Sequence, residues 1–234
     1  MPKIYTIYGP ISYKTVPLFP GVKVIDKEIA ADNLLLAKEV LDDNELPFVL
    51  FYGTLLGAIR DADFIDHDED IDLAMGIEYR SCVFDCLPQF MNLGFRVARY
   101  DRKGLLSLIR NGEYIDFYFF HPYVENELVA CVGNLTFERF LTQTRDLVFK
   151  GATFQIPCDF ADCLELEYGP DWRIPVVYND YNMPKWKIAL LKLKEYVKEL
   201  LPDDLYFYLS RKAEMRTEDK SWDRMKAFKK SHNL

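Results

Sequence analysis

The chain has 234 residues, half of them hydrophobic and 28 % charged, with a formal net charge of −8. This composition excludes a disordered or fibrous chain, because enough apolar surface is present to form a sizeable core. The acidic balance also argues against sequence-independent binding of duplex nucleic acid, which requires a basic face.

The charge is unevenly distributed along the chain. Residues 185–234 contain thirteen Lys and Arg against eight Asp and Glu, a net +5, which leaves −13 on residues 1–184. This basic tail predicts a solvated helix face or a peripheral contact with an anionic partner. No apolar run suits a signal peptide or approaches the roughly 18 residues of a membrane-spanning helix. We therefore expect a soluble, cytoplasmic protein without a transmembrane segment.

Hydrophobic periodicity and turn signals predict alternating helices and strands in the first half of the chain. In chain order we expect a short hairpin or an extended arm at 4–15, a helix at 26–44 capped by Asp26, a strand at 48–52, a helix at 55–60, a strand at 70–73 and a helix at 78–92 that Pro88 kinks or ends early. The run at 48–52 is apolar throughout, which is typical of a strand buried on both faces.

The second half of the chain predicts strands and then helices. We expect strands at 95–97, 105–109, 114–120 and 128–132, a helix at 136–142, an extended segment at 153–156, a helix at 159–167, and two or three helices within 185–201, 203–214 and 217–231. The pattern predicts an α/β fold of the mixed α+β kind, a small mixed sheet with flanking helices. Residues 1–184 would form the main domain, and residues 185–234 a helical extension packed on it.

An acidic segment follows the second predicted helix, and seven of its twelve residues, at 61–72, are Asp or Glu. Two carboxylates about 4 Å apart repel each other by roughly 4 kcal/mol at an effective dielectric constant near 20, so such acids are either solvated or neutralised by a cation. In a strand at 70–73, Asp70 and Asp72 share one face about 6.7 Å apart. This spacing predicts a Mg²⁺ (or Mn²⁺) site with open positions for water and phosphate, to which Asp68 could add a ligand.

Two further features complete the predicted site. Asp116 is the only acid in the strand at 114–120, and burying an unpaired carboxylate is costly unless a partner such as a shared metal neutralises it. Gly53-Thr54 stands between a strand and a helix, where backbone N–H groups and a hydroxyl at the positive end of the helix dipole favour phosphate. Arg60, the only Lys or Arg within 53–79, predicts a bidentate grip on the same phosphate.

Two other kinds of acidic segment fit the sequence less well. Most segments of this acidity are solvated loops, but the strand alternation, the acid on a second strand and the upstream Gly-Thr favour a site. An EF-hand loop beginning at Asp61 would need Gly at its sixth position and Glu at its twelfth, where the chain has Asp66 and Asp72. The residues alone therefore indicate a site for metal and phosphate, without identifying a donor.

The segment at 51–75, FYGTLLGAIRDADFIDHDEDIDLAM, closely resembles the central motif of the LicD/fukutin-related family, whose members carry the polymerase-beta-like nucleotidyltransferase fold. That superfamily's pattern is Gly-Ser/Thr, then two acids separated by one apolar residue, then a third acid on a later strand. Gly53-Thr54, Asp70-Ile71-Asp72 and Asp116 match it in order. A second block at 150–175 also resembles the family. The chain departs from the pattern at Asp66-His67, where family members usually have Pro-Trp.

The resemblance implies a phosphotransferase with a nucleotidyltransferase-like catalytic domain at residues 1–184. Relatives move phosphocholine or a polyol phosphate from a CDP-linked donor, such as CDP-choline or CDP-ribitol, to a glycan hydroxyl. By this resemblance Asp70, Asp72 and Asp116 would be the catalytic metal ligands, with Asp68 as a helper. Gly53, Thr54 and Arg60 would hold the phosphate oxygens of the substrate.

Two alternatives to this function remain open. The same fold supports NTP-dependent nucleotidyl transfer to a small molecule or a macromolecule. A non-catalytic protein could also keep the acids to bind a cation or a protein partner. The complete set of three acids on two strands favours an enzyme over the non-catalytic alternative.

Overall fold

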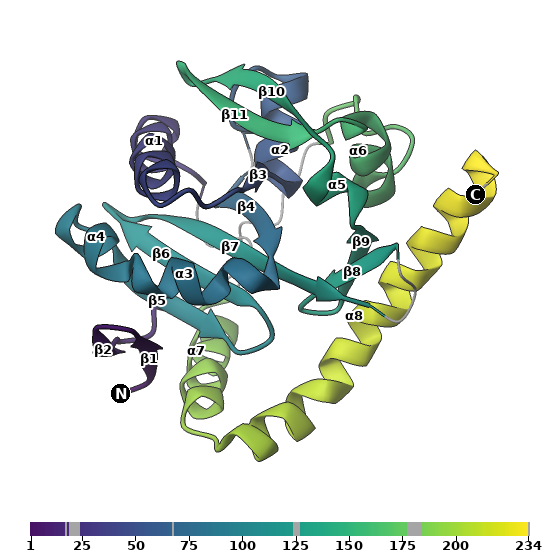
Figure 1. The fold of residues 1–234 in the computed structure, drawn as a ribbon. Coiled ribbons are helices and arrows are strands. Elements are labelled where there is room, and N and C mark those ends of the chain that lie inside the picture. Colours follow the sequence, from purple (N-terminus) through teal and green to yellow (C-terminus); the bar gives the residue numbers. More distant parts are fainter. Residues whose placement is uncertain (17, 19–23, 67, 124–126, 177–183, 234) are drawn as a thin grey trace.

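The structure is a computed structural model that describes residues 1–16, 18, 24–66, 68–123, 127–176 and 184–233. Its centre is a seven-stranded mixed sheet with helices packed around it (Figure 1). The mixed α/β fold expected from the sequence is confirmed. His67, where the sequence departs from the family pattern, lies outside the described residues.

The strand order of the central sheet is β3-β4-β7-β6-β5. The bounds of these strands are Val49–Leu50 for β3, Ile71–Gly76 for β4, Glu113–Pro122 for β7, Leu105–Arg110 for β6 and Arg96–Asp101 for β5. β4 and β7 run parallel, whereas the other neighbouring pairs on this path are antiparallel. The far end of β7 pairs with β8 (Leu128–Cys131), which pairs with β9 (Asn134–Phe137).

Two further hairpins and the helices surround this sheet. The hairpins are β1–β2 (Lys3–Thr6 and Gly9–Ser12) and β10–β11 (Thr144–Phe149 and Ala152–Pro157). The helices are α1 (Lys27–Asp43), α2 (Tyr52–Arg60), the 3₁₀ turn η1 (Ile77–Tyr79), α3 (Arg80–Asp85), α4 (Leu87–Asn92), α5 (Arg139–Thr142), α6 (Phe160–Tyr168), α7 (Lys185–Glu199) and α8 (Asp203–His232).

Two helix boundaries follow from single residues. The carboxylate of Asp26 accepts hydrogen bonds from the backbone N–H groups of Glu28 and Ile29, both at 3.1 Å, and so begins α1 as predicted. The helix predicted at 78–92 with an interruption at Pro88 is divided at Cys86, two residues earlier. Pro88 stands in the first turn of α4, where its missing N–H breaks no hydrogen bond.

The apolar face of the sheet is covered by α3 and α4. Phe90 packs edge-on against Phe117 of β7 with ring centroids 5.9 Å apart, and Phe84 packs against Phe119 at 6.2 Å. Side chains alternate along a strand, so burying Phe117 and Phe119 turns Asp116 of the same strand to the opposite face.

The sequence predictions missed β9 and β10, the strands of two hairpins with unusual turns. Residues 132 and 133 both have positive φ (51° and 82°), as do residues 150 and 151 (48° and 82°). Two consecutive residues with positive φ form a two-residue hairpin turn, for which Asn-Gly is a typical sequence, as at residues 111 and 112. Here the first positions are Val132 and Lys150, residues that seldom signal such a turn.

α8 is one continuous helix across the ranges 203–214 and 217–231, so residues 185–233 form two helices, one of the two numbers that the sequence allowed. The second half of α8 packs on the body of the protein. The backbone N–H of Leu135 in β9 donates to the Ser221 hydroxyl at 2.8 Å, and Arg224 pairs with Glu167 of α6 at 2.8 Å. Met225 and Phe228 are buried in the main core. α8 therefore belongs to the same core as β9 and α6.

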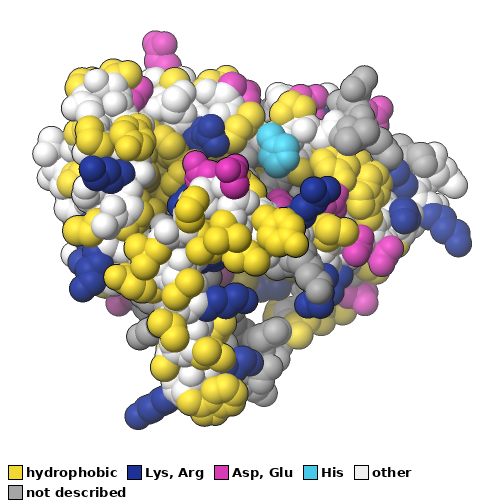
Figure 2. Space-filling view, turned by 90° about the horizontal axis from the view of Figure 1, so that it is seen from below, with side chains coloured by type: hydrophobic (Ala, Val, Ile, Leu, Met, Phe, Trp, Pro, Cys, Tyr) yellow, Lys and Arg dark blue, Asp and Glu magenta, His cyan; other side chains and the backbone are white. Residues whose placement is uncertain are grey.

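α7 and the beginning of α8 contrast with this packing, because many of their large hydrophobic side chains are exposed. Figure 2 views the molecule from below Figure 1, the side on which α7 is drawn. Hydrophobic side chains lie at this surface, with Lys and Arg among them. Among the described helices, none is long and apolar enough to cross a membrane.

The packing of α8 predicts unequal effects for two methionines on that helix. Met225→Ala removes a fully buried side chain and should lower the free energy of unfolding by about 2–5 kcal/mol. Met215, on the same helix, is 52 % exposed, so Met215→Ala should change it by less than about 0.5 kcal/mol. Urea denaturation of both variants measures the difference. Equal effects would show that the second half of α8 does not share the core.

Candidate active site

The predicted acids meet in a row of side chains that crosses four neighbouring strands. Asp72 of β4 pairs in register with Asp116 of β7, which pairs with Ser107 of β6, which in turn pairs with Arg99 of β5. Residues paired across a sheet point to the same face. Two acids, a hydroxyl and a guanidinium therefore lie side by side on the face opposite α3 and α4.

Asp116 is held from the β6 and β5 side of this row. Its Oδ1 accepts a hydrogen bond from the Ser107 hydroxyl, and its Oδ2 accepts one from the Arg99 guanidinium at 2.8 Å. Burial raises the pKa of Asp116, and Arg99 and Ser107 act in the opposite direction. Arg99 thus provides the positive charge that lets a buried carboxylate remain ionised beside Asp72.

Asp72 is held by the first turn of α2. Its Oδ2 accepts a hydrogen bond from the backbone N–H of Gly53 at 3.0 Å, and its own backbone N–H donates to the Thr54 hydroxyl at 2.9 Å. Burial raises the pKa of Asp72, and the charges of Asp68 and Asp116 raise it further. The helix dipole and the Gly53 N–H favour the ionised form.

Asp68 lies against the start of α2 and has an unused oxygen. Its Oδ2 is buried and has no hydrogen-bond partner, and burial raises the pKa of this group to about 7. A Cβ at position 53 would lie 2.6 Å from that oxygen, so only Gly53 leaves room for the carboxylate. Asp70 precedes β4, and the pKa of Asp70 is raised by burial and by the charges of Asp72, Asp116 and Asp68.

The four predicted metal ligands, Asp68, Asp70, Asp72 and Asp116, therefore lie in one electrostatic environment. Burial raises the pKa of every member, and charged neighbours within the set raise it further for Asp70 and Asp72. Oxygen donors with an unpaired buried atom suit a hard cation such as Mg²⁺. Within the described part of the chain, no three Asp, Glu, His or Cys side chains form a ready metal cage. Proteins usually hold Mg²⁺ with one or two carboxylates plus water and substrate phosphate.

Two of the predicted phosphate-binding residues have other partners in the structure. The Thr54 hydroxyl is buried and accepts from the backbone of β4, so it positions Asp72. Arg60 stands at the opposite end of the nine-residue helix α2 from Gly53, roughly 10 Å away at 1.5 Å per residue. Its guanidinium makes two hydrogen bonds to Asp61, at 2.9 and 2.7 Å. Gly53, by contrast, lies beside the acids as predicted.

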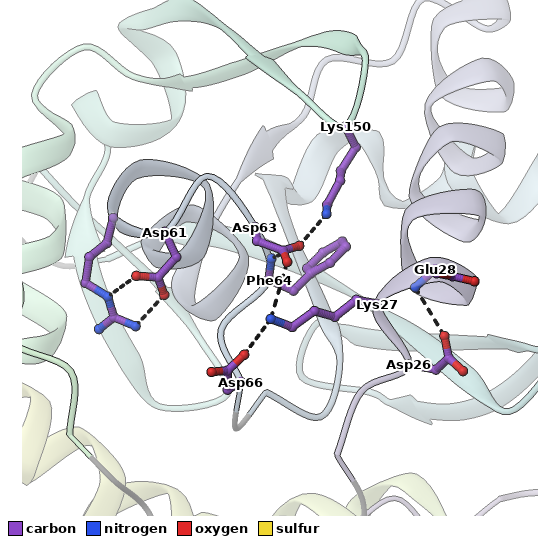
Figure 3. A network of polar contacts seen from close by, with 9 residues as sticks. Asp26, Lys27, Glu28, Asp61, Asp63, Phe64, Asp66 and Lys150 are labelled. Carbon is purple, nitrogen blue, oxygen red and sulfur yellow. Dashed lines mark hydrogen bonds and ion pairs between the residues drawn. The ribbon is translucent and has the colours of Figure 1, made fainter.

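The remaining acids of the loop are neutralised by ion pairs on the protein itself. Lys27 at the start of α1 pairs with Asp66 at 2.6 Å and with Asp63 at 3.3 Å, and Lys150 also pairs with Asp63 (Figure 3). Asp61 is the partner of Arg60, as described above. The loop acids thus separate into those at 61–66, which form ion pairs with Arg60, Lys27 and Lys150, and Asp68, Asp70 and Asp72, whose charges raise the pKa of Asp70 and Asp72.

A cavity of about 680 Å³ lies between α2, the acidic loop and the segment after α6. Its walls are mainly apolar, and Arg60, Lys27 and the loop acids stand at its rim; the lining includes Leu56, Phe64, Ile65, Tyr168, Trp172 and Pro175. Burial raises the pKa of Tyr168, and the charges of Asp72 and Asp68 raise it further. Tyr168 therefore lines the cavity within the electrostatic influence of Asp72 and Asp68.

The sequence predictions did not include Arg99, Ser107 or the tyrosines beside Asp72. Tyr52 packs edge-on against Tyr118 with ring centroids 5.0 Å apart, and its buried hydroxyl has no hydrogen-bond partner. Tyr52 also has φ of +39°, an uncommon conformation directly before Gly53. A signal for Ser107 was present, because it is the one polar residue in the run 105–109. The position of Arg99 beside Asp116 could not be predicted without knowing which strands pair.

The chain matches known proteins through this region. The family described as "LicD/FKTN/FKRP, nucleotidyltransferase domain" matches residues 45–159. The ribitol-5-phosphate transferase FKTN of Mus musculus is 26 % identical over 170 residues, which are 68 % of this chain and 36 % of that protein. An uncharacterized protein of Rickettsia typhi is 31 % identical over 149 residues, 62 % of this chain and 47 % of that protein. The chain thus spans between a third and a half of the length of these relatives.

Solved structures show remote likeness. The antibiotic-resistance factor ANT(2'')-Ia aligns with a TM-score of 0.46 and 16 % identity over 88 % of this chain and 98 % of that one. The lincosamide antibiotic adenylyltransferase LnuA aligns with a TM-score of 0.41 and 10 % identity over 69 % of this chain and 95 % of that one. The family match covers Gly53-Thr54, Asp70, Asp72 and Asp116. Residues 45–159 of the chain therefore belong to the LicD/FKTN/FKRP nucleotidyltransferase domain family.

Proposed function

We propose that this transferase is Mg²⁺-dependent and moves a phosphoryl-linked group from a CDP-activated donor to a hydroxyl acceptor such as a glycan. The observation that carries the proposal is the register of Asp72 and Asp116, side by side at the first turn of α2, with the unpaired oxygen of Asp68 nearby. A buried set of acids is costly unless a cation is shared among them. The start of a helix is also a favourable place for phosphate.

The residues of the chain would divide the work of such a transfer. Asp70, Asp72 and Asp116 would hold Mg²⁺ (or Mn²⁺), and Asp68 has the free oxygen that can complete the site or accept the proton of the attacking hydroxyl. When bound, the metal neutralises the donor diphosphate and the charge that develops on departing CMP. Gly53 leaves room for the acids at the helix start, and Arg99 maintains the charge of Asp116.

The cavity beside Tyr168 is the place we assign to the nucleoside end of the donor. Its volume of about 680 Å³ and its mainly apolar walls are typical of small-molecule sites. Arg60 and Lys27 at its rim offer positive charge, although each is paired with loop acids in this structure. The similarity to FKTN, a ribitol-5-phosphate transferase, supports a polyol phosphate as the transferred group, and phosphocholine is the other donor group that the family resemblance suggests.

Asp72→Asn tests the metal assignment. The substitution removes one charge with almost no change in shape. Mutating a residue that only positions a metal ligand typically lowers activity by about 10–100-fold. Loss of a ligand itself should therefore lower turnover by more than about 100-fold. The fold should persist, because burial already disfavours the charged carboxylate. Release of CMP from CDP-ribitol and CDP-choline measures activity, and circular dichroism checks the fold. Asp146→Asn, on exposed β10, is the matched control. Near-normal turnover of Asp72→Asn would refute the assignment.

The raised pKa of Asp68 predicts how stability depends on pH. In the metal-free fold this pKa is about 7, above the ordinary value of 3.8, so the protonated form is favoured and folding takes up a proton. Stability should therefore fall as pH rises from about 4 to about 7, and no further loss from this group should occur above that range. Mg²⁺ competes with protons, so it should raise Tm more at about pH 8 than at about pH 5.

Thermal unfolding with EDTA or Mg²⁺ at these two pH values measures this effect. At a concentration 100-fold above Kd, the metal should add about 2.7 kcal/mol of stability. Asp68→Asn should make the EDTA profile less steep, because it removes one of the groups whose pKa is raised in the fold. A Tm response to Mg²⁺ that is the same at both pH values would contradict a site built from these acids.

Binding of the donor can be tested separately from binding of the metal. With Mg²⁺ present, CDP-ribitol or CDP-choline should raise Tm, and a Trp172→Ala substitution in the cavity wall should reduce the shift while leaving the Mg²⁺ response in place. Since Trp172 is buried, each shift is measured against the variant's own Tm. Stabilisation by ATP or CTP and not by CDP-linked compounds would instead support the alternative, an NTP-dependent nucleotidyltransferase with the same metal site.

A further inference from the structure

α7 presents its apolar stripe to solvent instead of to the protein. Trp186, Leu190, Leu193 and Val197 follow helical spacing on one side of the helix, and their exposed fractions run from 48 % for Val197 to 69 % for Trp186. Leu200, just past the end of the helix, continues the stripe and is 61 % exposed. A helix of a soluble domain normally buries such a stripe.

A different face of α7 joins it to the protein. Ile188 and Leu191, about half a turn away from the stripe, are partly buried. Lys198 pairs with Asp101 of β5 at 3.4 Å. The helix is therefore fixed to the edge strand of the sheet through a narrow inner face, while its broader apolar side faces outward.

The first turns of α8 add to this exposed surface. Leu205, Tyr208 and Leu209 share one face at helical spacing and are 44 %, 76 % and 55 % exposed. Figure 2 views the molecule from below Figure 1, the side on which α7 and the first turns of α8 are drawn, and its hydrophobic side chains are interspersed with Lys and Arg. Isolated exposed apolar residues are ordinary, but a stripe along a helix marks an interaction surface.

The charges of α7 favour an anionic partner. The sequence of the helix contains five Lys and two Glu, in a chain whose net charge is −8. At 100° per residue, Lys187 and Lys194 flank the stripe on the Leu190 side and Lys185 flanks it on the other, and all three are exposed. Trp and Leu on one side with Lys along both borders is the pattern of a helix that lies in a membrane interface.

We propose that α7 docks the protein on an anionic lipid surface. The stripe of Trp186, Leu190, Leu193 and Val197 enters the boundary between headgroups and acyl chains, and the flanking Lys side chains extend to the lipid phosphates. A second copy of the chain suits this face less well, because an isologous contact would bring two Lys-rich helices together. The contact lies on α7, whereas the basic tail beyond residue 217 uses Ser221, Met225 and Phe228 to pack on the core.

Vesicle binding by the full chain tests this inference independently of the catalytic proposal. The protein should sediment with vesicles of phosphatidylcholine and phosphatidylserine, and much less with phosphatidylcholine alone. Changing Lys185, Lys187 and Lys194 to Gln should weaken binding by about fivefold for each Lys, close to 100-fold together, and added salt should weaken the parent protein similarly. Leu190→Gln with Leu193→Gln should abolish binding.

Controls distinguish docking from misfolding and from self-association. The α7 side chains are exposed, so the variants should keep the parent Tm and the parent circular dichroism spectrum. Val148→Gln, an equally exposed apolar residue on β10, should leave vesicle binding unchanged. Failure to bind anionic vesicles, or binding that the α7 variants retain, would overturn the proposal. So would a concentration-dependent dimer of the parent chain that Leu190→Gln with Leu193→Gln converts to monomer.

Discussion

The parallel pairing of β4 with β7 is the constraint on which the site depends. It sets Asp72 opposite Asp116 on neighbouring strands, which lie about 4.8 Å apart in a sheet. Two ionised carboxylates at that spacing repel by roughly 3–4 kcal/mol at an effective dielectric constant near 20. The surrounding residues reduce this cost from both sides, with Arg99 and Ser107 on Asp116 and the Gly53 N–H on Asp72.

The opposite face of the same strands supplies the free energy that holds the acids together. Ile71 and Leu73 of β4 and Ile115 and Phe117 of β7 are fully buried. Each such side chain contributes about 1.5–3 kcal/mol when removed from water, so the core can hold a row of acids that would otherwise separate. The remaining unfavourable interaction, including the unpaired oxygen of Asp68, is what a bound cation would relieve. The apolar face of the sheet thus contributes the stability that a row of buried acids on the opposite face requires.

β5 joins this site to the outer surface of the molecule. Arg99 extends from it toward Asp116, and two residues later Asp101 pairs with Lys198 of α7 and accepts a hydrogen bond from Tyr206 of α8 at 2.7 Å. The helices with the exposed apolar stripe are thus attached to the strand that neutralises the third acid. A protein that acts at a lipid surface would hold its acids at a fixed distance from that surface through this strand.

The sequence by itself determined the local features, namely the Asp26 cap, the break at Pro88, the alternation at Asp70-Ile71-Asp72 and the isolated acid at Asp116. Each of these depends on neighbours within a few residues. Only the tertiary structure decided which strands pair. Register brought Arg99 and Ser107 to Asp116, and the length of α2 placed Arg60 in the cavity and away from the acids. Strand pairing is non-local, because its free energy comes from side chains that meet only in the folded protein.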